Sequence, residues 1–554
     1  MQKNALLILS LMAFSLSACG GTPSGGQSVL DSSGDGSTLS SEGSDVSSEE
    51  SEVSSEVDGF LPTDDPEEPV EINFWHCMNR EKSENLAKIV KKFNDANPKY
   101  HVTAIAPENT LDRFHELVMT KITAGEVPAL CMGYPDYISM YMTRNVENCH
   151  ILKLDDFFDD PNFGYSAAEK EDFVDAFFEE GNHYQFDGLW SVPMYKSTEI
   201  MYYNANWFAG DNPETVAYVA RKGSEIDAEK LQAYNDALND VANAAYYATD
   251  AQLAAMKEAT QAIGGYTYQV PETWEEMISL AETMVENRQN ESLSNQNFYA
   301  VGHHSDANLL ISQMAQLGIP YTVNDAASKE DPKKHIAFNN ADAKDLVQEL
   351  VDLYDGHILK TTNSVGDSFS PHDGLAGFQS VMAIGPSAGW SFGNSNNFKV
   401  KLAPVPYRSE KPEWLSKAPS SFGPKYFQEG PSICFFDNEN KYIHKGAWLF
   451  YKYLADPVNN ANMALENGCE PVRDSSFETD NYVYWTNKHS LDLKYDIPYT
   501  TSQLRENYIV SEHFIGSAEA HSQMGRLLNY ILAKGRSVEE AFSSAYNICC
   551  AAAS

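Results

Sequence analysis

The chain has 554 residues and a formal net charge of −40, from 39 basic and 79 acidic residues. Such an acidic surface repels phosphate groups, which excludes a nucleic-acid partner. Hydrophobic residues make up 42% of the sequence, enough to fold into several domains. No segment reaches the roughly 18 consecutive apolar residues of a membrane-spanning helix, which excludes an integral transporter.

The first 19 residues have the pattern of a signal peptide. Lys3 supplies a positive charge, residues 5–14 are apolar, and Leu16-Ser17-Ala18-Cys19 resembles the lipobox of bacterial lipoproteins. This resemblance implies that the thiol of Cys19 carries a lipid, which anchors the chain at the extracellular face of the membrane. The alternative is an ordinary signal peptide with an incidental cysteine. Residues 20–68 contain mostly Ser, Gly, Asp, Glu and Thr, which predicts a disordered acidic tether.

Predicted strands and helices alternate beyond the tether. Strands alternating with helices predict an α/β fold with a mainly parallel sheet, in which ligands bind beyond the carboxyl ends of the strands. The first predicted elements are a strand at 71–75, a helix at 86–93, a strand at 100–105, a helix at 111–122 closed by Gly125, and a strand at 129–133.

Residues 210–265 break this alternation with two consecutive helical patterns. Asp227 is the predicted N-cap of the first, and the second ends at Gly264-Gly265. We therefore expect a helical hairpin inserted into the fold. The alternation then resumes with a helix at 274–285, a strand end followed by a helix at 338–354, strands at 297–301 and 381–385, a helix at 445–455, and a final helix that begins at the capping box Ser537/Glu540.

Several motifs, in this order, resemble the extracellular solute-binding proteins of carbohydrate ABC importers, the family that includes maltose-binding proteins. The resemblance extends over residues 70–548. Ala129 stands where the family usually has Asp, and the hairpin at 210–265 is a second departure. The motifs are residues 72–76 (INFWH), 93–98 (FNDANP), 124–128 (AGEVP), 196–204 (KSTEIMYYN), 271–276 (PETWEE), 382–390 (MAIGPSAGW), 445–457 and 468–473 (GCEPVR).

The resemblance implies a two-lobed, periplasmic-binding-protein-like fold of type II, with a hinge and an interlobe cleft. Closure of the cleft around a sugar would let the protein dock on the transmembrane subunits of an ABC permease. No cofactor and no chemical reaction follow from such a fold. The expected division is residues 69–195 and 431–490 for lobe 1, and residues 196–430 and 491–554 for lobe 2, with the insertion 210–265 in lobe 2.

A sugar cleft needs aromatic faces for the C–H surfaces of the ligand and polar groups for its hydroxyls. Aromatic residues at predicted strand ends and turns are the candidates for the first role, whereas Trp274 and Trp448 lie at core spacing on helices and are expected to be structural. The candidate ligand-binding aromatic residues are Trp75, Tyr134, Tyr195, Trp390 and Phe514. The candidate polar residues are His76, Asp136, Glu470 and Arg473.

Three other functions compete with sugar binding. A glycoside hydrolase also has an aromatic cleft with carboxylates, but the sequence lacks the common catalytic motifs. The same fold can bind a peptide, a polyamine or a phosphorylated polyol, and a structural adhesin would bind no solute.

His303-His304 suggests a metal site but has no third ligand at useful spacing. Seven cysteines remain besides Cys19, so at least one lacks an intrachain partner, and most are expected to be buried.

Overall fold

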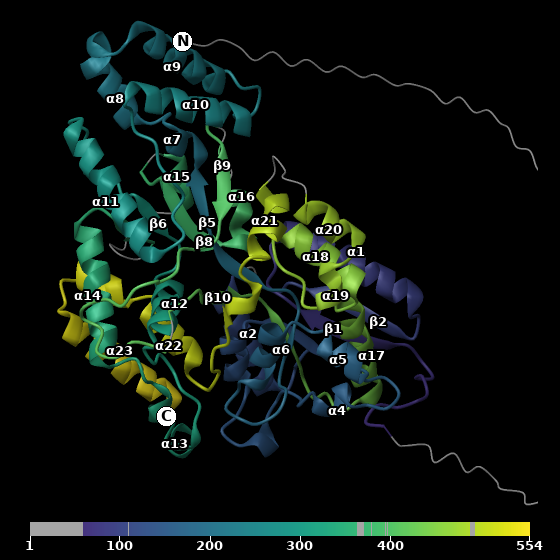
Figure 1. Cartoon of the computed structure of the whole chain (residues 1–554). Helices are drawn as coiled ribbons and strands as arrows, with labels where there is room; N and C mark the ends of the chain where they lie inside the picture. The colour runs from purple at the N-terminus through teal and green to yellow at the C-terminus, as the bar shows by residue number, and fades with distance from the viewer. Residues whose placement is uncertain are drawn as a thin grey trace, which may run out of the picture. The chain divides into compact units, whose positions relative to one another are not determined.

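The computed structural model describes residues 59–554 except 109, 363–370, 378, 394, 396, 421 and 488–492. The predicted signal peptide, the lipidation site Cys19 and most of the predicted tether lie outside the described residues. The described residues form one compact unit, built on two β-sheets with helices packed around each (Figure 1).

The first sheet has five strands in the order β2-β1-β3-β11-β4. Strands β1, β2 and β3 are parallel, and β11 runs antiparallel to β3 and β4. The strands predicted at 71–75, 100–105 and 129–133 are therefore confirmed within one residue. The elements are β1 (Val70–Trp75), α1 (Arg80–Ala96), β2 (Tyr100–Ile105), α2 (Leu111–Ala124), β3 (Leu130–Gly133), β4 (Val192–Pro193), β11 (Ser432–Phe435), α17 (Lys441–Leu454) and α18 (Pro457–Asn467).

The second sheet has the order β12-β10-β5-β8-β6-β7, and β9 also pairs with β5. The strand predicted at 297–301 begins only at Val301, because Phe298 and Tyr299 lie in the loop before the sheet and pack against their neighbours. The elements are β5 (Ser197–Asn204), α11 (Trp274–Asn290), β6 (Val301–His303), α12 (Asp306–Leu317), α14 (Ala341–Asp355), β7 (Leu359–Thr361), β8 (Met382–Pro386), β9 (Val400–Ala403), β10 (Tyr426–Glu429), β12 (Tyr508–Ile509), α22 (Ser517–Met524) and α23 (Val538–Ala553).

The chain passes between the two sheets three times, from β4 to β5, from β10 to β11 and from β11 to β12, and the first two of these crossings are adjacent. At the first crossing the backbone of Lys196 exchanges hydrogen bonds with that of Glu470. At the second, Gly430 has φ 148°, and a Cβ atom there would lie 2.6 Å from the carbonyl oxygen of Tyr195. Glycine is therefore required where the two crossing segments approach each other.

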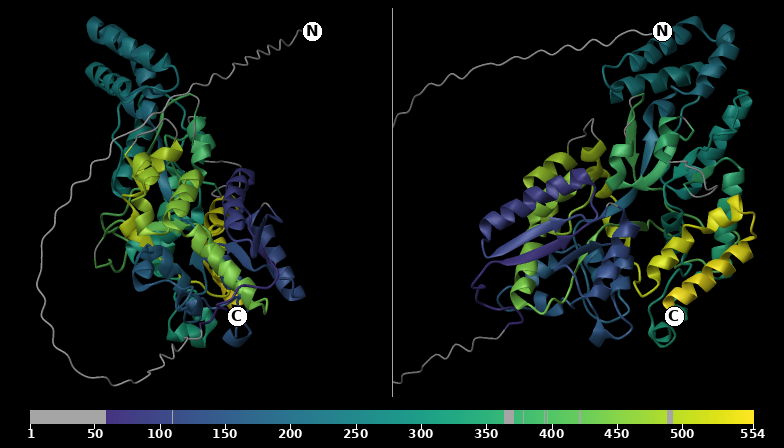
Figure 2. Two further views of the ribbon diagram at one scale, coloured as in Figure 1. Left: turned by 90° about the vertical axis from the view of Figure 1, so that its right-hand side faces the viewer. Right: turned by 180° about the vertical axis from the view of Figure 1, so that it is seen from behind.

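The predicted helical hairpin is confirmed. It consists of α9 (Ala228–Ala242) and α10 (Asp250–Ile263), preceded by α8 (Pro213–Lys222), and it extends from the second sheet beyond β5 and β9 (Figures 1 and 2). The Asp227 carboxylate accepts hydrogen bonds from the first turn of α9, and Gly264 ends α10 in the left-handed conformation. Apolar side chains of the two helices form a separate small core, among them Tyr234, Val241, Leu253, Met256 and Ile263.

The tether prediction is wrong for its last ten residues. Leu61 is buried, and its N–H donates a hydrogen bond to Asp160 at 2.8 Å. Asp65 accepts hydrogen bonds from Tyr100 at 2.8 Å and from Lys445 at 3.1 Å. Two apolar side chains, Phe60 and Leu61, and specific partners for the carboxylates thus fix residues 59–68 on the first lobe.

Trp274 and Trp448 are buried, which confirms their structural role. All seven cysteines in the described part of the chain are free thiols, and five of them are buried. Within the described ranges, none of the helices has the length and apolar character needed to cross a bilayer. The division of the lobes at residues 195/196, 430/431 and 490/491 stays a prediction.

Candidate functional site: a cavity between the two lobes

A cavity of about 250 Å³ lies where the carboxyl end of β3 faces the crossing strand β10 and the segment after β12. We call it the interlobe cavity. Its polar and aromatic lining includes Tyr134, Asp136, Glu180, Phe427, Glu429, His513 and His521. Both sheets therefore contribute walls, and the position beyond a parallel strand is the one at which α/β folds bind ligands.

Asp136 enters the cavity because β3 ends directly before a tight turn. Tyr134 precedes the short helix α3 (Pro135–Ile138), and Pro135 occupies its first position, which places Asp136 in the first turn. The Asp136 carboxylate lies 2.9 Å from Nδ1 of His513. Burial raises the pKa of Asp136, but the hydrogen bond and the charges of His513 and His521 outweigh it, so this pKa lies below its usual value.

Glu429 is held by a chain of side chains from two helices. It is the last residue of β10, and its carboxylate accepts a hydrogen bond from the Asn308 amide in α12. The Asn308 amide oxygen in turn lies 3.1 Å from Nε2 of His521 in α22. This chain fixes the Glu429 carboxylate and the His521 ring relative to each other.

Glu180 is the third carboxylate of the cavity. It belongs to the short 3-10 helix η3 (Glu180–Asn182) and forms a buried ion pair with Lys196 at the first interlobe crossing. The Lys196 ammonium also contacts the hydroxyl of Ser432 at 3.2 Å and the carbonyl of Gly430 at 3.3 Å. The cavity wall is thereby joined to both crossing segments.

Aromatic rings cover part of the cavity. Tyr134 and Tyr137 follow β3, and Phe427 lies in β10 with its ring 6.1 Å from that of His521. Tyr137 is fixed on its far side, because its ring stacks on His115 at 4.0 Å and its hydroxyl donates to Asp112 at 2.7 Å. These rings offer flat apolar surfaces beside the carboxylates.

Direct contacts join the two lobes beside the cavity. The Ser139 hydroxyl donates to the carbonyl of Phe514 at 2.8 Å, and the N–H of Ile515 donates to the Gln185 side chain at 3.0 Å. Further along this seam, the Asn324 amide donates to the Tyr184 carbonyl at 2.8 Å. The lobes are therefore in contact along one side of the cavity.

The structure brings two of the nine predicted ligand-binding residues, Tyr134 and Asp136, into the cavity. Trp75 ends β1 half-buried, beside a core cluster that includes Phe114 and Tyr141. His76 is 2% exposed, and burial lowers its pKa to about 4. Tyr195 is buried in the core of the first lobe.

The other four predicted residues have structural contacts outside the lining of the cavity. Trp390 packs against Gly468, where a Cβ atom would lie 2.4 Å from the indole. Glu470 accepts a hydrogen bond from Tyr508 and lies 3.5 Å from Arg505. Arg473 binds Asp172 at 2.8 Å, and Phe514 stacks on His335 at 4.2 Å. Contact of any of the nine residues with a ligand stays a prediction.

Four residues that line the cavity were not predicted from the sequence, namely Glu180, Glu429, His513 and His521. Glu429 lies at the second crossing, which no quoted motif covers, and His521 reaches the cavity only through the packing of α22. Only His513 could have been suspected from the sequence, because it precedes Phe514, which was a candidate ligand-binding residue.

No protein-family model matches the chain, and no curated protein sequence matches it. Solved structures of binding proteins do match in fold. The cyclic alpha-maltosyl-1,6-maltose binding protein from Arthrobacter globiformis shares 16% identity and a TM-score of 0.58, over 88% of this chain and 99% of that one. The maltose/maltodextrin-binding domain MalE from Bdellovibrio bacteriovorus, bound to maltotriose, shares 14% identity and a TM-score of 0.55, over 87% and 98%.

A third similar structure, UgpB from Mycobacterium tuberculosis in complex with glycerophosphocholine, shares 14% identity and a TM-score of 0.58, over 87% of this chain and 97% of that one. The chain thus has the two-lobed α/β fold of these binding proteins, which confirms the predicted fold class. At these identities the likeness establishes the fold alone. The class of ligand has to be inferred from the chemistry of the cavity.

Proposed function

We propose that this chain is the solute-binding protein of an ABC importer, which captures a sugar or short oligosaccharide in the interlobe cavity and delivers it unaltered to a membrane permease. The observation that supports this most is the state of the three cavity carboxylates. Asp136, Glu180 and Glu429 each have a fixed donor partner, namely His513, Lys196 and Asn308. Each of these carboxylates is therefore a hydrogen-bond acceptor that is held in place by a donor group of the protein itself.

Such a lining suits a neutral polyol. Each carboxylate has more acceptor sites than its one protein partner uses, so oxygens remain to accept hydrogen bonds from sugar hydroxyls. The Tyr134 and Phe427 rings supply faces for the C–H surfaces of a sugar ring. The solved relatives whose names include maltose, maltodextrin or maltotriose support the same class of ligand.

A cationic or phosphorylated solute is the main alternative, and the glycerophosphocholine complex of UgpB is an example of a non-sugar ligand in this fold. Two of the three cavity carboxylates already lie beside a basic side chain, so the attraction for a polyamine is weakened. The carboxylates also disfavour a phosphate group. A neutral carbohydrate agrees better with both observations.

We propose no chemical step in the cavity. Glycoside hydrolysis needs a carboxylic acid whose raised pKa keeps it protonated near the scissile bond. The pKa of Asp136 is lowered, so this group is a carboxylate at neutral pH. Burial raises the pKa of Glu199, but Glu199 is not among the residues that line the cavity.

The N-terminal sequence supports the cellular part of the proposal. A lipid on Cys19 would hold the protein at the extracellular face of the membrane, and the acidic segment after it would act as a tether. Labelling of producing cells with a palmitate analogue tests this anchor. The label should appear on the full chain and be absent from a Cys19→Ala variant, and equal labelling of both would refute the anchor.

A melting-temperature screen tests the ligand class. A solute that binds only the native state raises the midpoint in proportion to the logarithm of its concentration. We expect maltose or a maltooligosaccharide to raise the midpoint, and spermidine, peptides and glycerophosphocholine to leave it unchanged. A shift with one of these three and none with any sugar would replace the carbohydrate by that solute.

A further inference from the structure

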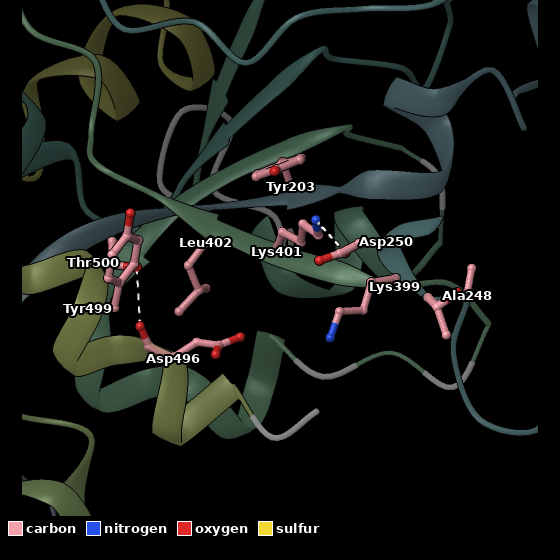
Figure 3. A pocket seen from close by; sticks show the side chains of 10 residues that line it. Tyr203, Ala248, Asp250, Lys399, Lys401, Leu402, Asp496, Tyr499 and Thr500 are labelled. Atoms are coloured by element: carbon pink, nitrogen blue, oxygen red, sulfur yellow. Dashed lines mark hydrogen bonds and ion pairs between the residues drawn. The ribbon is translucent and has the colours of Figure 1, made fainter. Parts of the chain in front are cut away.

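A second cavity lies at the base of the helical hairpin, where the start of α10 faces β9 and the helix α21 (Leu493–Thr501) (Figure 3). We call it the insertion pocket, and its volume is about 520 Å³. Tyr203, Asp250, Lys399, Lys401, Asp496 and Tyr499 line it. Among the described residues, none lines both this pocket and the interlobe cavity.

Lys399 is the unusual residue of the insertion pocket. Its residue surface is 8% exposed, so it is more than nine-tenths buried. Its backbone is fixed by two hydrogen bonds, from its N–H to the side chain of Asn206 at 3.0 Å and from the N–H of Ala205 to its carbonyl at 2.9 Å. The side chain extends from this anchored position into the open space of the pocket (Figure 3).

The ammonium group of Lys399 makes no hydrogen bond or ion pair with any residue that the structure describes. The ammonium lies 5.8 Å from the centroid of the Tyr247 ring. Burial lowers the pKa of Lys399, although the charges of Asp496 and Asp250 oppose this effect. Most of the Lys399 side chain is buried, whereas its ammonium opens into the pocket without a hydrogen-bonded counter-ion. An anion placed beside this ammonium would gain a charge-assisted contact.

Lys401 shows the ordinary arrangement on the same segment. It lies two residues further along, in β9, and its ammonium binds the Asp250 carboxylate at 2.6 Å. Figure 3 shows the two lysines side by side, with the Lys401 amino group directed at Asp250 and the Lys399 amino group directed into the pocket. The pocket therefore contains one lysine whose charge is already paired and one that is not.

We propose that the insertion pocket is a second ligand site, which binds a monoanionic sugar acid with its carboxylate on Lys399. One hydrogen-bond-free ammonium matches one carboxylate, whereas Asp250 and Asp496, which also line the pocket, would repel a phosphate dianion more strongly than a monoanion. Tyr203 and Tyr499 supply aromatic surfaces for the sugar ring, and Tyr499 is 48% exposed and so accessible. The volume is ample for one sugar unit.

Calorimetric titration of the full chain with glucuronate tests this site, with glucose and glucose 6-phosphate as comparison ligands. We expect glucuronate to bind, and Lys399→Met to weaken its binding at least tenfold. Lys401→Met is the matched control and should change the affinity less than threefold. Tyr134→Ala, which alters the interlobe cavity, should leave glucuronate binding unchanged.

Four results would overturn the proposal: no binding of glucuronate, equal binding to Lys399→Met, tighter binding of glucose 6-phosphate, or loss of glucuronate binding in Tyr134→Ala. The last would place the anion in the interlobe cavity. Circular dichroism melting shows whether Lys399→Met is folded. If it is not, Tyr499→Ala replaces it, because Tyr499 is half-exposed, and an affinity for glucuronate equal to that of the unmodified chain would then overturn the site.

Discussion

Asp136 and His513 are 377 residues apart in the sequence and 2.9 Å apart in the structure, and both line the interlobe cavity. Asp136 follows β3 of the first sheet, and His513 follows β12 of the second. Their contact therefore connects the two lobes at the place where we propose that the sugar binds. Capture of a ligand and closure of the lobes would depend on the same pair.

Asp136→Asn should weaken sugar binding by about 1–2 kcal/mol, because it replaces a charge-assisted hydrogen bond to His513 by a neutral one. Titration calorimetry with the best sugar of the screen measures this change. Asp187→Asn is the control, since Asp187 forms an exposed ion pair with Lys329 at 2.9 Å and exposed pairs contribute little. Equal affinities of Asp136→Asn and the unmodified chain would remove this pair from the mechanism.

Tyr134→Ala should weaken sugar binding by about 1–3 kcal/mol through loss of an aromatic face in the cavity. Fluorescence or calorimetric titration gives the affinity, and a melting curve shows that the variant is folded. An unchanged affinity would mean that the ring does not contact the sugar.

Trp390 is a predicted ligand-binding residue that does not line the cavity. The variant Trp390→Ala tests whether this side chain only packs in the fold or also contacts the ligand. The indole packs on Gly468 beside the Lys494 ammonium, which lies 5.6 Å from the ring, so the variant should be less stable by about 3 kcal/mol. The same titration decides its other role. A loss of sugar affinity of about 1–3 kcal/mol supports Trp390 as a ligand contact, whereas normal affinity in a folded variant excludes it.

Glu199→Gln should make thermal stability less dependent on pH. Burial raises the pKa of Glu199, and the charge of Glu429 adds to this effect. The folded state therefore holds this proton more tightly than the unfolded state, so the resulting stabilisation is present below the unfolded pKa and is lost as the pH rises through the folded value. His303 lies 3.7 Å from Glu199. Burial lowers the pKa of His303 to about 3, so His303 is neutral between pH 5 and pH 8.

Melting temperatures of the unmodified chain and Glu199→Gln, measured from pH 5 to pH 8, test this prediction. The variant should gain stability relative to the unmodified chain as the pH rises. Glu225→Gln is the control, because Glu225 lies on the surface in an exposed ion pair with Lys222. A constant difference between Glu199→Gln and the unmodified chain across the range would contradict a raised pKa.

Local signals predicted most of the fold correctly. The N-cap at Asp227, the left-handed glycines at 125 and 264, and the capping box at Ser537 all end or begin helices where the sequence indicates. These signals depend on neighbouring residues, which a sequence displays directly. The prediction of disorder was wrong for residues 59–68, because their order depends on distant partners such as Asp160 and Lys445.

The cavity was harder to predict for the same reason. Tyr134 and Asp136 were found because the end of a parallel strand is a recognisable position. His513, His521 and Glu429 reach the cavity through contacts between elements more than a hundred residues apart, such as the Asn308–Glu429 hydrogen bond. Periodicity and composition carry no information about such pairs.

Titration of the full chain with maltooligosaccharides of increasing length, followed by chromatography of the recovered sugar, tests the central claim most directly. Binding of one sugar molecule in the interlobe cavity, weakened in Asp136→Asn and Tyr134→Ala and followed by recovery of the intact sugar, is the predicted result. Recovery of shorter sugars, or binding that neither variant changes, would contradict the capture of an unaltered carbohydrate in this cavity.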